Sequence, residues 1–108
     1  MDGNVSKKFE KIRTFLKLFF ATKPRQQSAL LQTITSEQAS GLAEVIYNLL
    51  SFEVPKKTKH LLKKRERIIK KVISKKIKDK KKTELFVKYY KFFIEILLSV
   101  KQQLESIL

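Results

Sequence analysis

The sequence predicts an all-α fold, a small bundle of about five helices with one strongly basic helix and one long aromatic C-terminal helix. The chain has only two glycines and two prolines in 108 residues, and its apolar residues recur at spacings of three and four. Hydrophobic residues make up 43% of the chain, which is enough for one modest core. We therefore expect residues 1–108 to form a single helical domain.

A proline separates the first two predicted helices. A helix over residues 5–22 would place one apolar face on the core, made of Phe9, Ile12, Leu16 and Phe19 or Phe20. It should end near Lys23, because proline disfavours helical backbone in the residue before it. Pro24 then suits the first turn of a short helix over residues 24–34, whose apolar contacts would be Leu30, Leu31 and Ile34.

The third helix is expected over residues 35–50. Thr35 followed by Gln38 fits a capping box, and Ser36 is an equally good cap. Gly41 costs about 1 kcal/mol relative to alanine inside a helix, so it marks either a close-packing point or a later helix start. The core face would comprise Leu42, Val45, Ile46, Leu49 and Leu50.

Two further helices follow a break at residues 51–54. Pro55 or Thr58 opens a basic helix that runs to about Ile77, and residues 76–82 (KIKDKKK) form a charged hinge. The fifth helix should run from about Lys80 to Leu108 with Asp79 or Thr83 as its cap. Its apolar stripe has nearly a 3.5-residue repeat, so it suits packing within the domain or against a partner helix. The stripe comprises Leu85, Tyr89, Phe92/Phe93, Ile96, Val100, Leu104 and Ile107/Leu108.

The basic helix sorts its side chains into two halves. At about 100° per residue, its apolar residues share one arc of about 180°. These are Leu61, Leu62, Ile68, Ile69, Val72, Ile73 and Ile77. The cations in the opposite half are Lys63, Lys64, Arg67, Lys70, Lys71, Lys75 and Lys78. Because a disordered tail has no reason to sort its residues in this way, these cations are the candidate polyanion-binding residues.

Three charged residues break this sorting. Glu66 falls near the edge of the apolar arc, where it can turn toward Lys70 four residues on. Arg65 and Lys76 fall well inside the arc. Either their stems lie over the edge of the core, or the helix bends or ends near residues 74–76.

Positive charge is concentrated in one quarter of the chain. The net charge is +15, and residues 56–82 contribute 15 basic and 2 acidic residues, so the rest of the chain nets +2. Codon bias would act on the whole chain, so this localisation favours a polyanion partner over a merely solvated lysine face. Lysine outnumbers arginine 21 to 4, which predicts phosphate contact without strong sequence preference.

The sequence argues against an enzyme, a metal site or a cofactor. There is no cysteine, and His60 is the only histidine, so no ligand set for a transition metal can be assembled from these residues. The two glycines stand alone at Gly3 and Gly41, which excludes a glycine-rich phosphate loop. The aromatic residues Tyr89, Tyr90, Phe92 and Phe93 resemble a base-stacking platform, but their helical spacing favours a place in the core.

No segment has the character of a secretory signal or a membrane span. The N-terminal apolar stretch is interrupted by charged residues, and residues 85–100 carry Lys88, Lys91 and Glu95 in only 16 residues. We expect a soluble intracellular protein of the nucleus or a virion, not a secreted one. An interfacial helix on anionic membrane is a third, weaker hypothesis.

Four features follow one another between Ser28 and Leu85. They are a Leu-Leu segment, a helix LAEVIYNLL, a Lys-rich helix HLLKKRERIIKKVISKK and a second basic cluster KDKKKTEL. In this order they resemble a small protein encoded by Polinton/Maverick-type elements and adintoviruses. The long aromatic helix Leu85–Leu108 departs from that family, whose members often end in a glycine-rich apolar tail. The resemblance implies a double-stranded DNA virus or element and a small basic factor associated with virion DNA. It implies no catalytic residue.

The leading hypothesis is a non-enzymatic nucleic-acid-binding protein that contacts phosphates, with double-stranded DNA as the expected partner. The alternative is a helical interaction or oligomerisation module that uses Leu85–Leu108 to dock on another chain or on a second copy.

Overall fold

The computed structural model describes the backbone of residues 3–108 and the side chains from residue 10 onward. Within that part the chain forms eight helices and no strand, so the predicted all-α class is confirmed, although the helices outnumber the predicted five. They are α1 (Gly3–Ala21), α2 (Pro24–Gln32), α3 (Ser36–Leu49), α4 (Lys56–Lys64), α5 (Glu66–Ile73), α6 (Asp79–Lys88), α7 (Tyr90–Ser99) and α8 (Lys101–Glu105).

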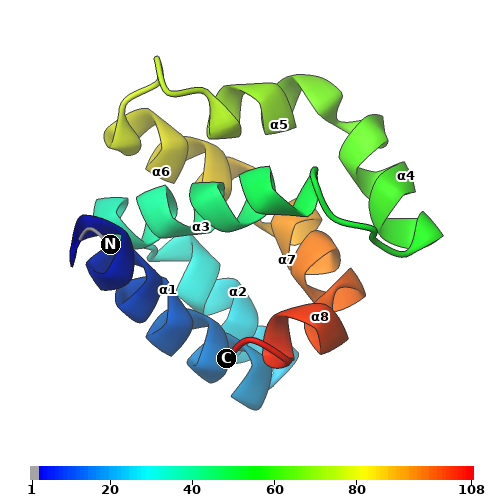
Figure 1. Cartoon of the computed structure of the whole chain (residues 1–108), viewed down its shortest axis with the longest axis horizontal. Coiled ribbons are helices and arrows are strands. Elements are labelled where there is room, and N and C mark those ends of the chain that lie inside the picture. The colour runs from blue at the N-terminus through cyan, green and yellow to red at the C-terminus, as the bar shows by residue number, and fades with distance from the viewer. Residues whose placement is uncertain (1–2) are drawn as a thin grey trace.

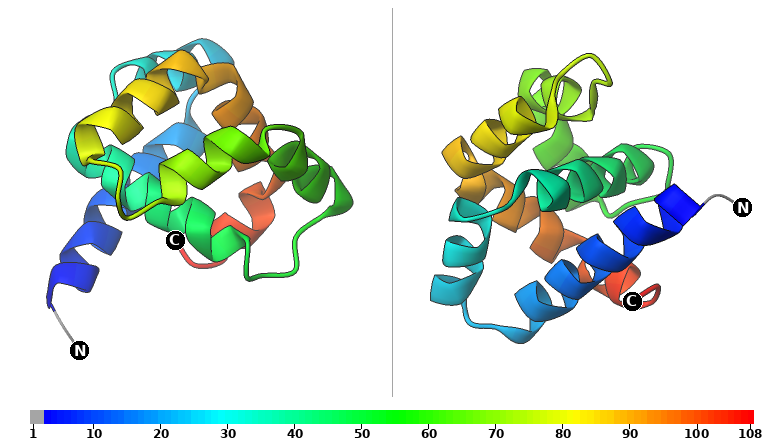
Figure 2. Two further views of the ribbon diagram at one scale, coloured as in Figure 1. Left: turned by 90° about the horizontal axis from the view of Figure 1, so that it is seen from above. Right: turned by 90° about the vertical axis from the view of Figure 1, so that its left-hand side faces the viewer.

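Helix α3 is the central element of the bundle. It packs against α1 on one side and against α5 and α6 on the other, while α7 contacts α2 and α4. Figure 1 shows α3 crossing the middle of the molecule between α1 and α2 below and α5 and α6 above. The right-hand view of Figure 2 shows the same order from the side. The basic stretch of the sequence is therefore held on one side of the bundle.

The predicted end of α1 before Pro24 and the predicted starts of α2 and α3 are confirmed, whereas α1 begins at Gly3 and α2 ends at Gln32, two residues from the predicted positions. Helix α1 ends at Ala21, and Pro24 occupies the first turn of α2. Thr35 caps α3, and its hydroxyl accepts a hydrogen bond from the Gln38 amide at 3.1 Å. In return, the Thr35 amide donates to the Gln38 side chain at 3.0 Å. These bonds satisfy amide groups that have no partner inside the helix.

Gly41 lies in the interior of α3, so it is a close-packing point rather than a late helix start. A β-carbon placed there would lie 2.9 Å from Cβ of Ile12 on α1. That distance is well below carbon–carbon contact distance, so the two helices approach each other only because residue 41 has no side chain. Small buried residues continue on both sides of it at Ala39, Ser40 and Ala43.

The predicted apolar faces are mostly buried. Ile12, Leu16 and Phe19 of α1 lie in the core, and Phe9 lies outside the residues whose side chains are described. The buried set on α3 contains Leu42, Ile46 and Leu49, whereas Val45 is half-buried. Leu50 was predicted in the core and is 46% exposed, because α3 ends at Leu49 and the chain turns away there.

The prediction of one continuous basic helix is wrong. Arg65 adopts φ −125° and ψ 48°, which ends α4 and begins α5. Its carbonyl accepts hydrogen bonds from the amides of Ile68 and Ile69, so the same residue caps the second helix. Helix α5 then ends at Ile73, and residues 74–78 form a loop.

The predicted fifth helix is also divided, into α6, α7 and α8. Tyr89 and Val100 have φ near that of Arg65, at −110° and −115°, and each ends one helix and begins the next. The first of these helices is preceded by Lys78 rather than by the predicted cap Asp79 or Thr83. A straight helix over residues 80–108 would measure about 44 Å. The longest extent of the molecule is only 34 Å, so the breaks keep the apolar stripe on the core.

The C-terminal stripe forms part of this chain's own core. Its buried residues are Leu85, Phe92, Phe93, Ile96, Val100 and Leu104, and Ile107 alone of the stripe is exposed. A short polar chain holds α7 against α4, in which the Thr58 hydroxyl donates to Ser99 at 2.7 Å and Ser99 donates to the Ile96 carbonyl at 2.6 Å. The Arg13 side chain donates to the backbone oxygen of Leu108 at 2.7 and 2.9 Å, which joins α1 to the last residue.

Replacing Gly41 with alanine should destabilise the protein. Helix propensity favours alanine by about 1 kcal/mol, but overpacking against Ile12 costs about 1–3 kcal/mol. We expect a net loss of up to about 2 kcal/mol, measured as a lower Tm by circular dichroism. The control is Asn48→Ala, which changes an exposed position of the same helix and should leave the Tm equal or slightly higher. A higher Tm for Gly41→Ala would contradict the close-packing interpretation.

Candidate nucleic-acid interface

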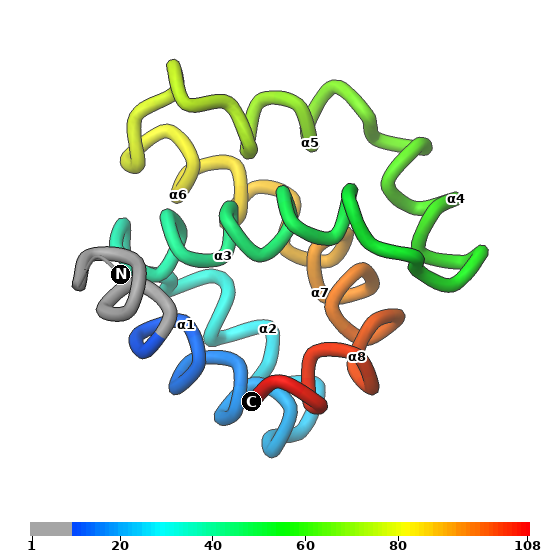
Figure 3. The backbone as a smooth tube through the Cα atoms, viewed as in Figure 1, coloured from blue at the N-terminus to red at the C-terminus, as the bar shows by residue number. Residues whose placement is uncertain are grey.

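The seven candidate cations are all exposed, but they come from three different segments. Lys63 and Lys64 lie in the last turn of α4. Arg67, Lys70 and Lys71 lie on α5, and Lys75 and Lys78 lie in the loop that follows it. We call this set the basic ridge. Figures 1 and 3 show α4, α5 and the loop along one side of the molecule, with a change of direction between α4 and α5.

The predicted single cationic half of one helix is therefore replaced by a bent ridge. Helix α5 keeps its two faces, because Ile69 and Val72 are buried beneath it while Arg67 and Lys71 are exposed one turn apart. Because Arg65 interrupts the helix, the sorting of side chains into an apolar and a cationic half does not continue from α4 into α5. Lys75 and Lys78 are not helical, so the loop rather than a helix face positions them.

One ion pair within the ridge was predicted correctly. The Lys70 ammonium lies 3.5 Å from a Glu66 carboxylate oxygen, four residues earlier on α5, and both side chains are largely exposed. Lys81 pairs with Glu84 at 3.6 Å. Among the side chains described, no other cation of residues 56–82 forms an ion pair, so most of this positive charge has no acidic partner within residues 10–108.

Part of the charge has a local structural role. Lys63 and Lys64 occupy the last turn of α4, and Lys70 and Lys71 the last turn of α5. A cation near a helix C-terminus is stabilised by the helix dipole by about 0.3–1 kcal/mol. Like charges three or four residues apart repel by a few tenths of a kcal/mol per pair, which offsets much of that gain. Dipole effects also leave the loop cations Lys75 and Lys78 unexplained.

Arg65 and Lys76, which the single-helix pattern placed among apolar residues, each have a structural explanation. The guanidinium carbon of Arg65 lies 5.6 Å from the Tyr89 ring centroid and 5.9 Å from that of Phe92. Arg65 thus links the break between α4 and α5 to the break between α6 and α7 through cation–π contacts. Lys76 is exposed in the loop, where its amide donates to the Ser74 hydroxyl at 3.2 Å. The helix therefore ends before Lys76. Of the two predicted explanations, a stem over the core edge or a helix that bends or ends near residues 74–76, the second holds for Lys76.

A polar hollow of about 380 Å³ lies between α3 and the loop before α6, and it includes one cation of the ridge. Lys75 lines it together with Lys82, Ser40 and the acidic residues Glu44 and Asp79. Lys82 is only 9% exposed, which its position in a charged run did not indicate. No buried side-chain nitrogen or oxygen in the described part lacks a partner, and a lysine stem can be covered while its ammonium lies at the edge of the core.

The aromatic residues that resembled a stacking platform lie mainly in the core. Phe92 and Phe93 are buried, and the Phe93 ring meets Phe86 edge to face with centroids 4.6 Å apart. Tyr89 and Tyr90 are half-buried. Sequence reasoning did not single out Phe52, which is 63% exposed in the loop before α4. The position of Phe52 next to the predicted break between helices was the sequence feature that could have indicated its exposure.

The described residues contain no group of three or more His, Cys, Asp or Glu side chains that could share a metal ion. His60 is exposed on α4. Within residues 3–108, none of the helices combines the length and the apolar character that a bilayer crossing demands.

Comparison of the chain with protein-family models, with curated proteins and with solved structures gave no match.

Replacing Arg65 with alanine should lower the free energy of unfolding by about 0.5–1 kcal/mol, because two cation–π contacts are lost. Arg65→Lys should recover part of the loss. The control is Lys64→Ala, which removes an adjacent exposed cation and should change the stability by less than about 0.5 kcal/mol. Urea denaturation measures all three variants. Equal stability of Arg65→Ala and the unsubstituted protein would show that the stacking has no energetic role.

Proposed function

We propose that this protein binds nucleic acid without strong sequence preference, through phosphate contacts made by the basic ridge. The observation that carries the proposal is the gathering of exposed cations along α4, α5 and the loop, with Glu66 and Glu84 the only acidic residues paired to cations of residues 56–82 in the described part. A surface needed only for solubility would do better with mixed charges.

Repulsion among the ridge cations and the release of counterions both favour binding of a polyanion. Arg67 and Lys71 are one turn apart on α5, and Lys75 and Lys78 follow in the loop. A phosphate chain placed along them would relieve their mutual repulsion. It would also release the cations condensed on the nucleic acid, which is the main driving force of non-specific binding.

The bend at Arg65 sets the number of phosphates that one straight duplex can meet. The helices α4 and α5, which carry these cations, run in different directions, as Figure 3 shows. A duplex that follows α5 and the loop would meet five ridge cations, of which Lys70 is paired with Glu66; the four others would give a log–log salt slope of about −3.6. Engagement of all seven would give a slope of about −6, and it would need a curved or flexible strand.

The chemistry of lysine supports phosphate contact rather than base recognition. Only Arg65 and Arg67 in the basic stretch carry the planar fork that reads guanine, and Arg65 is already stacked on two rings. Double-stranded DNA as the partner, and a nuclear or virion location, rest on the resemblance of residues 28–85 to the Polinton and adintovirus protein. That resemblance rests on sequence pattern alone.

The test compares two triple charge reversals that change the net charge equally. Arg67→Glu, Lys71→Glu and Lys78→Glu together should reduce duplex affinity at least tenfold, because each substitution removes one phosphate contact and adds a repulsive charge. Lys17→Glu, Arg25→Glu and Lys101→Glu change exposed cations of α1, α2 and α8, and should reduce affinity much less. Fluorescence anisotropy with a labelled duplex at several salt concentrations provides the measurement.

Circular dichroism should show that both triple variants keep their helix content. A salt-independent affinity, or an equal loss in the two variants, would overturn the proposal. The second result would mean that net charge alone, and not the ridge, attracts the nucleic acid.

A further inference from the structure

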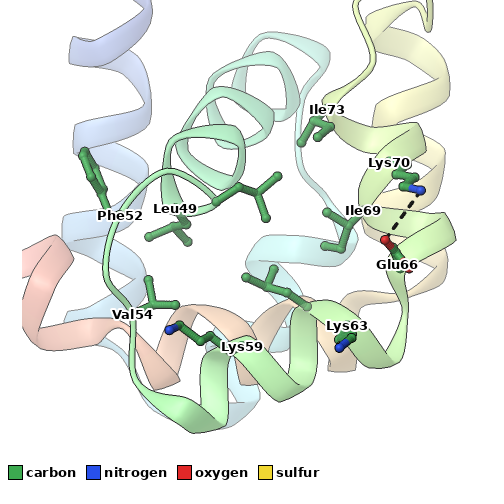
Figure 4. Close-up of a pocket in the computed structure, with 11 residues that line it drawn as sticks. Leu49, Phe52, Val54, Lys59, Lys63, Glu66, Ile69, Lys70 and Ile73 are labelled. Carbon is green, nitrogen blue, oxygen red and sulfur yellow. Dashed lines mark ion pairs between the residues drawn. The ribbon is translucent and has the colours of Figure 1, made fainter.

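An open apolar groove lies where the end of α3 meets α4 and α5. Its volume is about 390 Å³. Figure 4 shows Leu49 and Val54 facing Ile69 and Ile73 across it, with Phe52 at the outer end on the loop between α3 and α4. We call this feature the apolar groove. Leu50 and Leu62 complete its apolar lining.

The apolar groove continues into apolar surface that the chain leaves uncovered. Phe52 is 63% exposed and Leu50 is 46% exposed, although both are large apolar residues of the kind usually buried in a core. Covering the exposed part of a phenylalanine or leucine side chain removes apolar surface from water, which favours binding. Exposed apolar residues beside a groove are typical of a protein-interaction surface, whereas single scattered ones need no explanation.

The rim of the apolar groove is positively charged. Lys59, Lys63 and Lys70 line it, and among the residues that the structure describes Glu66 is the only acidic one that does so. Because Glu66 is paired with Lys70 at 3.5 Å, its charge is already compensated. Lys59 and Lys63 form no ion pair with any side chain described. A ligand that fits must therefore present an apolar surface bordered by negative charge.

We propose that the apolar groove binds an acidic amphipathic helix of a partner protein. Such a helix places apolar residues at positions i, i+3 or i+4, and i+7 in a groove between helices. Its apolar residues would cover Leu50 and Phe52, and its Asp or Glu residues would meet Lys59 and Lys63. Complementary charge at the rim would both orient the helix and speed its association.

Other occupants leave one of these features unmatched. A nucleic-acid backbone carries the right charge but cannot cover aliphatic side chains. A second copy of this chain brings another +15 charge to a positive rim, which opposes association. A small anionic amphiphile could fill the volume, which lies near the lower end of the range of about 300–1,000 Å³ for ligand sites. It would leave the exposed Phe52 ring in water.

Two rim residues belong to the basic ridge as well. Lys63 and Lys70 line the apolar groove and also stand among the candidate phosphate contacts. The partner helix and nucleic acid should therefore compete for the protein. This competition rests on the proposed function, whereas binding of the helix in the groove does not.

The test uses three fluorescein-labelled peptides of about 16 residues, long enough for a helix to form on binding. The first has leucines at i, i+3 and i+7 flanked by glutamates, the second replaces every glutamate with lysine, and the third scrambles the first. Only the first should bind in fluorescence anisotropy. Phe52→Ser and Leu50→Ser should each weaken its binding about tenfold, as expected for anchor residues at an interface.

Leu18→Ser is the matched control, because Leu18 is 51% exposed on α1 and is not part of the groove. It should leave the peptide affinity unchanged. All three substituted residues are largely exposed, so the variants should stay folded, and circular dichroism checks that a loss of binding does not come from unfolding. Equal binding of the three peptides, or full affinity in Phe52→Ser, would overturn the proposal. Binding of oleate with no binding of the acidic peptide would also overturn it.

A duplex-binding measurement on Phe52→Ser separates the two proposals. Because Phe52 is not part of the basic ridge, its loss should leave duplex affinity unchanged while peptide affinity falls. Peptide binding by a protein that shows no duplex binding would support the apolar groove and refute the ridge. Addition of unlabelled duplex should release the labelled peptide if both proposals hold.

Discussion

The close contact between α1 and α3 at Gly41 is the constraint on which the rest of the bundle depends. Only a residue without a side chain allows Ile12 to come so near to the α3 backbone. With α1 seated there, and with Ala39, Ser40 and Ala43 small and buried, α3 can take helices on two sides. Helices α5 and α6 then pack on the side away from α1 (Figure 1). The basic ridge is carried outward because the apolar face of α5 is needed for this packing.

A second physical theme is the use of single non-helical residues to bend long apolar patterns around a small core. Arg65, Tyr89 and Val100 each end one helix and begin the next, and none of the three is a glycine or a proline. Burial of the apolar residues favours these bends, because a straight helix would extend beyond the core and expose part of its apolar stripe to water. The stacking of Arg65 on Tyr89 and Phe92 joins two of these bends, so the shape of the ridge is coupled to the C-terminal helices.

The charge distribution and the apolar groove together describe a surface with two kinds of chemistry. The ridge offers cations that have few acidic partners within the described part, and the apolar groove offers side chains that this chain does not cover. The two features share Lys63 and Lys70. A polyanion and an acidic helix satisfy different parts of this surface, and the shared lysines make binding of one sensitive to the other.

The sequence alone determined the all-α class, the end of α1, the start of α2, the capping box at Thr35 and the pairing of Glu66 with Lys70. These features depend on interactions within four residues, which local patterns specify. Tertiary packing alone decided the break at Arg65, the loop placement of Lys75 and Lys78, and the exposure of Leu50. A break costs helical hydrogen bonds that only burial of distant residues can repay. Whether a leucine is covered depends on which other helices reach it. Local sequence specifies neither this covering nor the position of the break.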